Sequence, residues 1–367
     1  MSVVLTATAV LPLVGIGGTP ADPTLAGISD GLVYSAMAAY AVALVAFAVD
    51  LAGGRRGALR ESVPVEVSPA VAAGTGTPRT GATGTPTRTG ATGTPTAIGG
   101  STSTTGGAAA STGAERGRRA AGVASAVFVL ATLLHLAAVL ARGASVQRVP
   151  WGDAYEFAVS GALVVSLVFV VLLRNGERWR WLGTFVVVPV LLMLMIATSF
   201  FYTQASALSP ALQSSWLVVH VSIAFLSSAL LTIGFSLAVV QLVQHRQEAV
   251  VAAGGATSRF LQRVPSSLQL EQTSFQLHAV AFVLWTFTVV AGAIWAAEAW
   301  GRYWGWDPKE VWSFVIWVVY AAYLHARSTA GWAGPRSAWI AVLGFACLLF
   351  NFLGVNYLFV GNHSYAL

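Results

Sequence analysis

The chain has 367 residues, of which 56% are hydrophobic and only 9% are charged. An ordinary soluble domain carries about 25% charged residues, so this composition indicates a protein embedded in membrane lipid and excludes a large soluble catalytic domain. The net charge of +6 reports membrane topology, and no soluble basic stretch suggests binding of nucleic acid. The one cysteine, Cys347, excludes an internal disulfide, a CxxC redox pair and a thiolate zinc cluster.

Apolar runs long enough to cross about 30 Å of hydrocarbon recur along most of the sequence. They predict an all-α fold, a polytopic membrane helix bundle of about eight transmembrane helices with both termini on the same side. The expected spans are residues 29–51, 122–141, 154–173, 181–201, 215–243, 276–299, 310–327 and 337–359.

The sequence divides into three parts. Residues 1–51 hold an N-terminal segment and the first span, and residues 121–367 hold the other seven. Residues 52–120 are rich in Gly, Thr, Pro and Ser, with a near-repeat at Gly74–Thr96. Because this stretch has few large apolar residues, we predict a disordered cytoplasmic linker.

Arginine and lysine residues are divided unevenly between the two sets of loops. With the linker left out, the split is 8 to 4. Positive residues are retained on the cytoplasmic side of short loops, so this bias orients the chain in the plasma membrane. It predicts that both termini and the Trp-rich loop at 300–309 face the outside.

Residues 295–317 contain six of the 13 tryptophans. Interfacial belts of membrane proteins account for some of them. Within the segment, Asp307, Pro308 and Glu310 have the spacing of a helix start, with Asp307 as N-cap and Glu310 as its reciprocal capping-box partner. A helix is therefore expected to begin here whatever the function.

The helix start does not explain Trp300, Trp304 and Trp306, which lie outside any apolar span and next to Arg302 and Lys309. A broad aromatic surface with two cations suits a large, flat, anionic ligand, and haem, with its planar macrocycle and two propionates, fits this description.

Two of the six histidines are expected near this loop. His220 lies in the outer part of the fifth span, and His363 lies just past the outer end of the eighth. Two imidazoles that face each other across a gap are the usual way to hold haem iron axially. The other four histidines lie elsewhere. His325 and His278 are expected near the inner ends of the seventh and sixth spans. His135 lies within the second span, where either a structural or a functional role is open, and His245 is interpreted as structural.

Several motifs together resemble the WWD signature of the CcsA/ResC family, called CcsB in actinobacteria, the haem-handling proteins of System II cytochrome c biogenesis. They are Trp300-Gly301, Trp304, Trp306 to Glu310, Trp312-Ser313, Trp317 and Tyr323 to Arg327. The resemblance reaches upstream to Trp216 through Val221, downstream to His363 through Ala366 and, more weakly, to Pro150 through Glu156. It leaves the linker and the first span unmatched.

The resemblance implies specific roles. The outer histidines of the family correspond to His220 and His363, and a membrane-embedded histidine at the position of His325 belongs to an inner haem site whose second ligand comes from a ResB-type partner. The residues expected to contact haem are His220, His363, His325, Trp300, Trp304, Trp306, Asp307, Trp312, Arg302 and Lys309.

The implied function is to conduct haem b outward and present it to apocytochrome c, where two thiols of a CxxCH motif add across the haem vinyl groups. Arg302 and Lys309 are expected to contact the propionates. With Cys347 as its one thiol, the chain depends on separate thiol-reducing proteins.

Three alternatives stay open at this point. A haem exporter or chaperone without synthase activity would use the same residues. A di-haem b-type electron carrier would need histidine pairs at matched depths on facing helices. A tryptophan cage for a quaternary ammonium solute would have no use for His220 and His363.

Overall fold

The computed structural model describes residues 21–53, 105–206, 212–256, 258, 260–329 and 331–363. Contacts divide the chain into a large unit, Met1–Gly54 with Gly117–Leu367, and a second unit, Arg55–Arg116. All regular structure in the described residues is helical, which confirms the predicted fold class.

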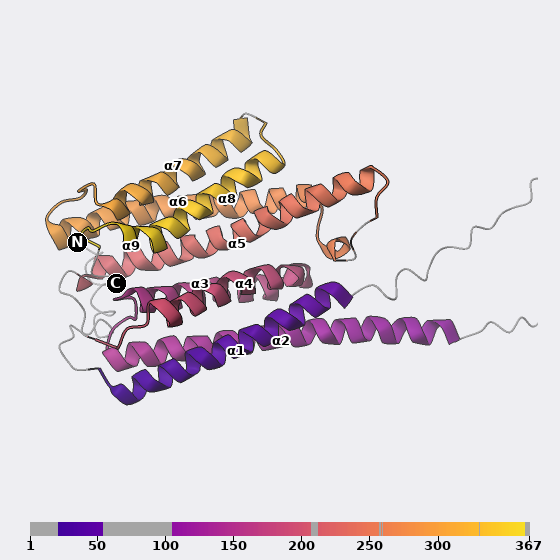
Figure 1. The fold of residues 1–367 in the computed structure, drawn as a ribbon, viewed down its shortest axis with the longest axis horizontal. Coiled ribbons are helices and arrows are strands. Elements are labelled where there is room, and N and C mark those ends of the chain that lie inside the picture. The colour runs from indigo at the N-terminus through magenta and orange to yellow at the C-terminus, as the bar shows by residue number, and fades with distance from the viewer. Residues whose placement is uncertain are drawn as a thin grey trace, which may run out of the picture. The chain divides into compact units, whose positions relative to one another are not determined.

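Helices of the large unit run in alternating directions along the chain (Figure 1). Their starts follow local signals: Asp153 caps α3, Ser214 caps α5, and Ser266 with Gln269 forms a capping box at α6. The helices are α1 (Pro23–Gly53), α2 (Thr105–Val146), α3 (Ala154–Arg174), η4 (Glu177–Leu182), α4 (Gly183–Phe200), α5 (Ser215–Ala252), η6 (Leu261–Arg263), α6 (Ser267–Trp300), α7 (Pro308–Thr329), α8 (Pro335–Leu349), the π-helical turn η7 (Phe350–Gly354) and α9 (Val355–Leu358).

Within the described residues, seven helical segments have the length and hydropathy of membrane spans, so the protein is a multi-pass membrane protein. They are Pro23–Ala52, Gly122–Val146, Ala154–Arg174, Arg178–Phe200, Ser215–Ala252, Ser267–Trp300 and Pro335–Leu358. The eighth predicted span, 310–327, is also helical, as α7, but it is not among these seven. Tryptophan, tyrosine and histidine side chains replace aliphatic ones along α7, which lowers its hydropathy.

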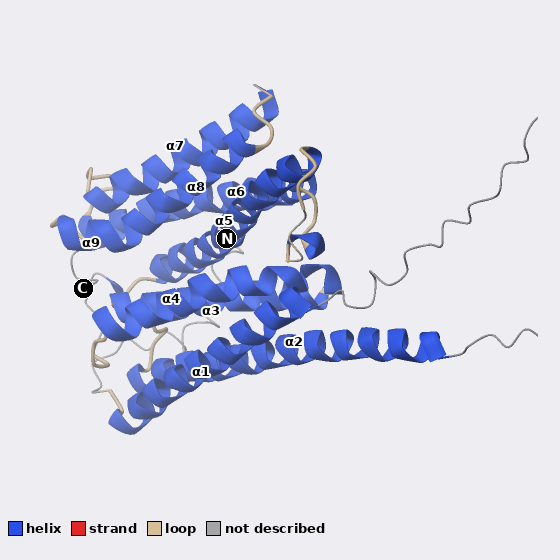
Figure 2. Cartoon of the chain, turned by 45° about the vertical axis from the view of Figure 1, so that its right-hand side comes forward, coloured by secondary structure: helices blue, strands red, loops and turns tan. Residues whose placement is uncertain are grey.

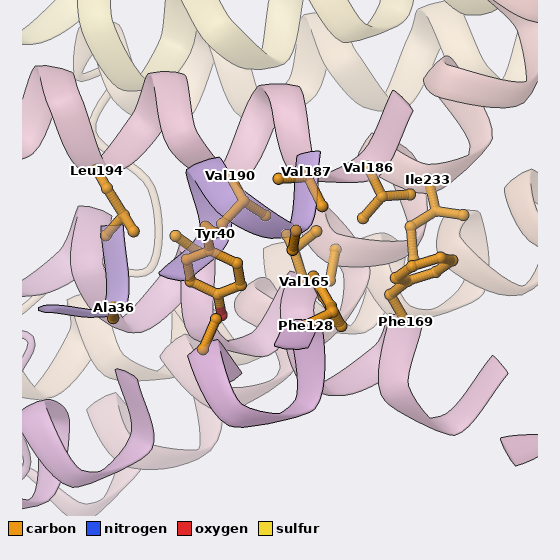
Figure 3. Close-up of a cluster of buried hydrophobic side chains, with 14 of the residues drawn as sticks. Ala36, Tyr40, Phe128, Val165, Phe169, Val186, Val187, Val190, Leu194 and Ile233 are labelled. Atoms are coloured by element: carbon orange, nitrogen blue, oxygen red, sulfur yellow. The ribbon is translucent and has the colours of Figure 1, made fainter. Parts of the chain in front are cut away.

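Helices α5 and α6 form the centre of the bundle, with α7 and α8 packed on one side of them and α3 and α4 near α5 on the other (Figures 1 and 2). A large buried cluster contains side chains from each of the helices α1, α2, α3, α4 and α5, among them Tyr40, Phe128 and Ile233 (Figure 3). A second cluster between α5, α6, α7 and α8 includes Tyr320 and Phe345. These two cores fix the helix positions that build the site at one end.

Helix α2 begins at Thr105, inside the stretch predicted to be a disordered linker, 52–120. The alanine-rich sequence after Thr105 favours helix, so α2 begins before the apolar run, whereas the segment with the hydropathy of a membrane span begins at Gly122. The remaining linker residues, 54–104, lie outside the described residues.

Candidate haem site

A cavity lies at the end of the bundle where α5 and α7 begin and α6 ends, and we call it the aromatic cavity. Its aromatic wall residues are Trp151, Phe157, Trp285, Trp295, Trp300, Tyr303, Trp304 and Phe352. The cavity has a volume of about 180 Å³, and it is partly open to solvent. Aromatic walls with an open side suit a flat, mostly apolar ligand with one edge toward solvent.

His220 projects into the aromatic cavity from the second turn of α5. Its Nδ1 lies 2.9 Å from the backbone carbonyl oxygen of Thr288 on α6. A carbonyl oxygen only accepts, so Nδ1 carries the proton and donates, while Nε2 holds the lone pair that can bind a metal. Gly292 permits this close approach, since a Cβ there would lie 2.8 Å from His220 Cε1.

His363 reaches the same cavity from beyond α9. Its Nδ1 lies 2.8 Å from Asp307 Oδ1, which again leaves the lone pair on Nε2. Burial raises the pKa of Asp307, but the hydrogen bond from His363 and two backbone donors outweigh it and hold the pKa below its ordinary value. Asp307 is therefore a carboxylate at neutral pH.

Trp295 lies in contact with both histidines. Its ring is nearly parallel to that of His220, with centroids 6.1 Å apart and an interplanar angle of 11°, and it lies 5.8 Å from the His363 ring. Trp300 meets His363 edge-on at 4.9 Å. The structure thus brings the two predicted outer histidines to one cavity, and it adds Trp295, which was not among the predicted contact residues.

The predicted helix start at Asp307 is confirmed. Asp307 Oδ1 accepts from the backbone N–H of Lys309 at 3.0 Å, and Glu310 Oε2 accepts from the Asp307 N–H at 3.0 Å. The Glu310 half of the predicted capping box is therefore present, while the Asp307 side chain caps Lys309 and not Glu310. Both hydrogen bonds satisfy donors that a helix start leaves without intrahelical partners. They hold the first turn of α7 against the cavity.

The tryptophans of the predicted aromatic surface, and Trp312 after them, separate into two groups. Trp300 and Trp304 line the aromatic cavity, whereas Trp306 does not and is 75% exposed. The backbone φ of Trp306 is 58°, a region that bulky residues rarely adopt. Trp312 also lies outside the cavity lining, where its ring packs 4.3 Å from that of Phe350.

The two predicted cations also differ. Lys309 lines the cavity, and its Nζ donates to Asn356 Oδ1 at 2.6 Å. Arg302 is exposed and is not among the lining residues. Lys309 therefore places a positive charge on the cavity wall, while Arg302 lies on the loop outside it.

Two histidines within the membrane have structural surroundings. His135 lies between two partners, Tyr40 Oη at 3.3 Å from Nδ1 and the Val159 carbonyl oxygen at 3.0 Å from Nε2. His278 is fully buried, and its Nε2 faces Gly234, where a Cβ would lie 2.8 Å away. Neither imidazole has room for haem iron, so the geometry disfavours a di-haem carrier based on them.

His325 is exposed on α7, and His245 is exposed on α5. His325 shares the exposed face of α7 with Phe314, Val318 and Ala322, which lie at helical spacing before it. This face points away from α6 and α8, so His325 is directed outward from the described helices, not toward the aromatic cavity.

The tyrosine-glutamate pair at the start of α3 anchors the cavity wall. Glu156 is 1% exposed and accepts from Arg148 Nη1 at 2.6 Å and Arg142 Nε at 3.0 Å. Tyr155 Oη lies 3.3 Å from Asp30 on α1. Arg142 and Arg148 are two of the four cations on the outer side of the predicted 8 to 4 split, but the structure buries them as the partners of Glu156. The double ion pair connects the end of α2 with the loop that contributes Trp151.

The family model described as Cytochrome C assembly protein matches residues 151–363, which is more than half of the 367 residues. This range contains both cavity histidines and the whole tryptophan loop. The chain belongs to this family. The chain is also similar to individual proteins of cytochrome c biogenesis.

Three such relatives are each named cytochrome c biogenesis protein CcsA. The protein from Synechococcus sp. (strain CC9902) is 42% identical over 178 residues, which cover 44% of this chain and 59% of the relative. Those from Guillardia theta and Prochlorococcus marinus (strain MIT 9313) are 42% and 41% identical, each covering 44% of this chain and 58% of the relative. The chain thus spans less than two thirds of the length of these relatives.

Proposed function

We propose that this protein binds haem b in the aromatic cavity and presents it on the extracytoplasmic side of the plasma membrane for attachment to apocytochrome c. The observation that carries the proposal is the matched geometry of His220 and His363. Both line one cavity, and both have Nδ1 hydrogen-bonded to an acceptor. Histidines that bind metals usually donate the other ring N–H to a carbonyl or carboxylate in this way.

The cavity walls support the same ligand. The rings of Trp295, Trp300 and Trp304 supply apolar contact for a porphyrin, and Lys309 supplies a cation for a propionate. The cavity is partly open to solvent, so one edge of a bound porphyrin would be accessible to acceptor thiols.

The chemistry proposed for the bound haem is thioether formation. Each acceptor thiol adds across one vinyl C=C bond, with sulfur bonding to one carbon and hydrogen to the other, and no net oxidation occurs. The protein contributes by orientation, since well-placed reactants can gain about 7–11 kcal/mol of barrier lowering. Acceptor thiols must arrive reduced, and Cys347 lies within α8, so separate thiol-reducing proteins are required.

Delivery of haem from the cytoplasmic side is proposed to use His325. Its exposure on α7 beside Phe314 and Val318 supports a second ligand from outside this chain, and we propose a ResB-type membrane subunit as its source. A partner helix on this face would both cover the apolar side chains and bring an imidazole to His325.

The direct test is purification of this protein together with its ResB-type partner, followed by absorption spectroscopy. A low-spin spectrum with two histidine ligands supports the cavity as a haem site, and covalent haem on a co-expressed CxxCH acceptor supports synthase activity over export alone. His245→Ala provides a control, because His245 lies on the same helix as His220 but is exposed. Haem content that depends on neither cavity histidine would contradict the proposal.

Gly292→Ala should reduce haem binding without removing a ligand. The added Cβ would lie 2.8 Å from His220 Cε1 and 2.9 Å from Nδ1, so the ring must turn away. A side chain forced about 30° from its rotamer costs on the order of 0.5–1.5 kcal/mol, which corresponds to up to about tenfold in affinity. Haem per purified protein measures the effect. Gly31→Ala on α1 is the control, since its Cβ meets nothing within 4 Å.

A further inference from the structure

Asp307 joins two segments that are far apart in the sequence. One carboxylate oxygen, Oδ1, accepts from the Lys309 backbone N–H at 3.0 Å and from His363 Nδ1 at 2.8 Å. The other, Oδ2, accepts from the Asn362 backbone N–H at 2.6 Å. One side chain thus caps α7 and also holds the segment that carries His363.

The C-terminal segment is shaped around this carboxylate. A Cβ at Gly361 would overlap Asp307 Oδ2, so a larger residue there would displace the carboxylate or the segment. An N-cap needs only the hydrogen bond to the first turn of α7. The contacts with Gly361, Asn362 and His363 go beyond that requirement, and they indicate a second role for Asp307.

The two cavity histidines are held by different acceptors. His220 donates to the neutral carbonyl of Thr288, whereas His363 donates to the charged carboxylate of Asp307. A carboxylate partner fixes the tautomer and ring orientation of a metal-binding imidazole and increases its basicity. The effect of Asp307 is therefore specific to His363.

We propose that Asp307 is the positioning residue for His363: it holds the ring with Nε2 as the iron-binding nitrogen and makes it the stronger of the two axial ligands. The inference rests on the proposed haem site and adds an asymmetry between its ligands. Because a stronger donor stabilises ferric iron, Asp307 should lower the reduction potential of haem in the cavity.

Two substitutions test the role. Asp307→Ala should give haem with His220 as its main axial ligand, and added imidazole should restore the six-coordinate, low-spin spectrum, since free imidazole needs no orienting partner. Asp307→Asn keeps an oxygen acceptor but removes the charge, so it should remain six-coordinate with a higher reduction potential than the unaltered protein. A purely structural role would predict neither the imidazole rescue nor the change in potential.

Asp22→Ala is the matched control. Asp22 also caps a helix, with Oδ1 accepting from the Thr24 N–H at 2.8 Å, and it is not among the residues that line the cavity. Its side chain accepts from the first turn of α1 and not from a cavity histidine, so its loss should leave the axial ligation and the potential unchanged.

The results of these substitutions distinguish a failure of the proposed haem site from a failure of the positioning role of Asp307. If His363→Ala leaves the spectrum unchanged, the proposed function fails. If His363→Ala alters the spectrum but Asp307→Asn has the same potential as the unaltered protein, the positioning role alone fails. The Asp307→Asn measurement decides the matter even where Asp307→Ala does not accumulate in the membrane.

Discussion

His220→Ala and His363→Ala are each expected to abolish cytochrome c maturation, and added imidazole should restore part of it. Each substitution removes one of two imidazoles that line the aromatic cavity. Under the proposed function, loss of one imidazole would leave the haem less firmly oriented for thioether formation. A small exogenous imidazole can occupy the vacant position because the cavity is open to solvent.

The measurement is covalent haem on a co-expressed CxxCH acceptor, with and without imidazole. His245→Ala should mature the acceptor normally, since this side chain is exposed elsewhere on α5. Normal maturation by both cavity variants would show that the histidine pair does not hold the haem. The same experiment with Gly292→Ala should give an intermediate loss, because that variant displaces His220 but retains its imidazole.

His325→Ala should lower the haem content of the whole complex, including the aromatic cavity. If haem enters through a site shared by His325 and the partner subunit, loss of this ligand acts before the outer site is filled. Variants of His220 or His363 should instead retain haem at the inner site. Haem per protein after purification with the partner distinguishes the two patterns.

Val318→Ala is the control for partner binding, because Val318 is exposed on the same face of α7 but has no ligand atom. It should leave the haem content unchanged. Full haem content in the His325→Ala complex would contradict haem delivery through α7. The proposed site in the aromatic cavity would not be affected, because it depends on other residues.

Much of the site could be predicted because its signals are local in the sequence. The helix start from Asp307 to Glu310 depends on residues at most three positions apart: Glu310 accepts from the Asp307 N–H as a capping box requires, while Asp307 caps the N–H of Lys309 instead of that of Glu310. Apolar runs likewise located the helices, including α7 at 310–327, although α7 is not among the seven described segments with the length and hydropathy of membrane spans. The positions of His220 and His363 relative to the span ends were enough to predict that they approach the same loop.

Side-chain directions could not be predicted in this way. Trp304 lines the cavity and Trp306 is exposed, although they are two residues apart, because the chain turns through a left-handed conformation at Trp306. Lys309 and Arg302 looked equivalent as loop cations, yet only Lys309 lies on the cavity wall, where Asn356 on α9 accepts its hydrogen bond.

The sequence by itself determined the membrane helices, the family and the residues of the tryptophan loop, because each depends on neighbouring residues or on a recognisable motif. The tertiary structure decided the partners of those residues. Asp307 binds His363, 56 positions away, and Thr288 binds His220 only because Gly292 lets α5 and α6 approach. Such contacts depend on helix packing, which brings distant segments together and leaves no local pattern in the chain.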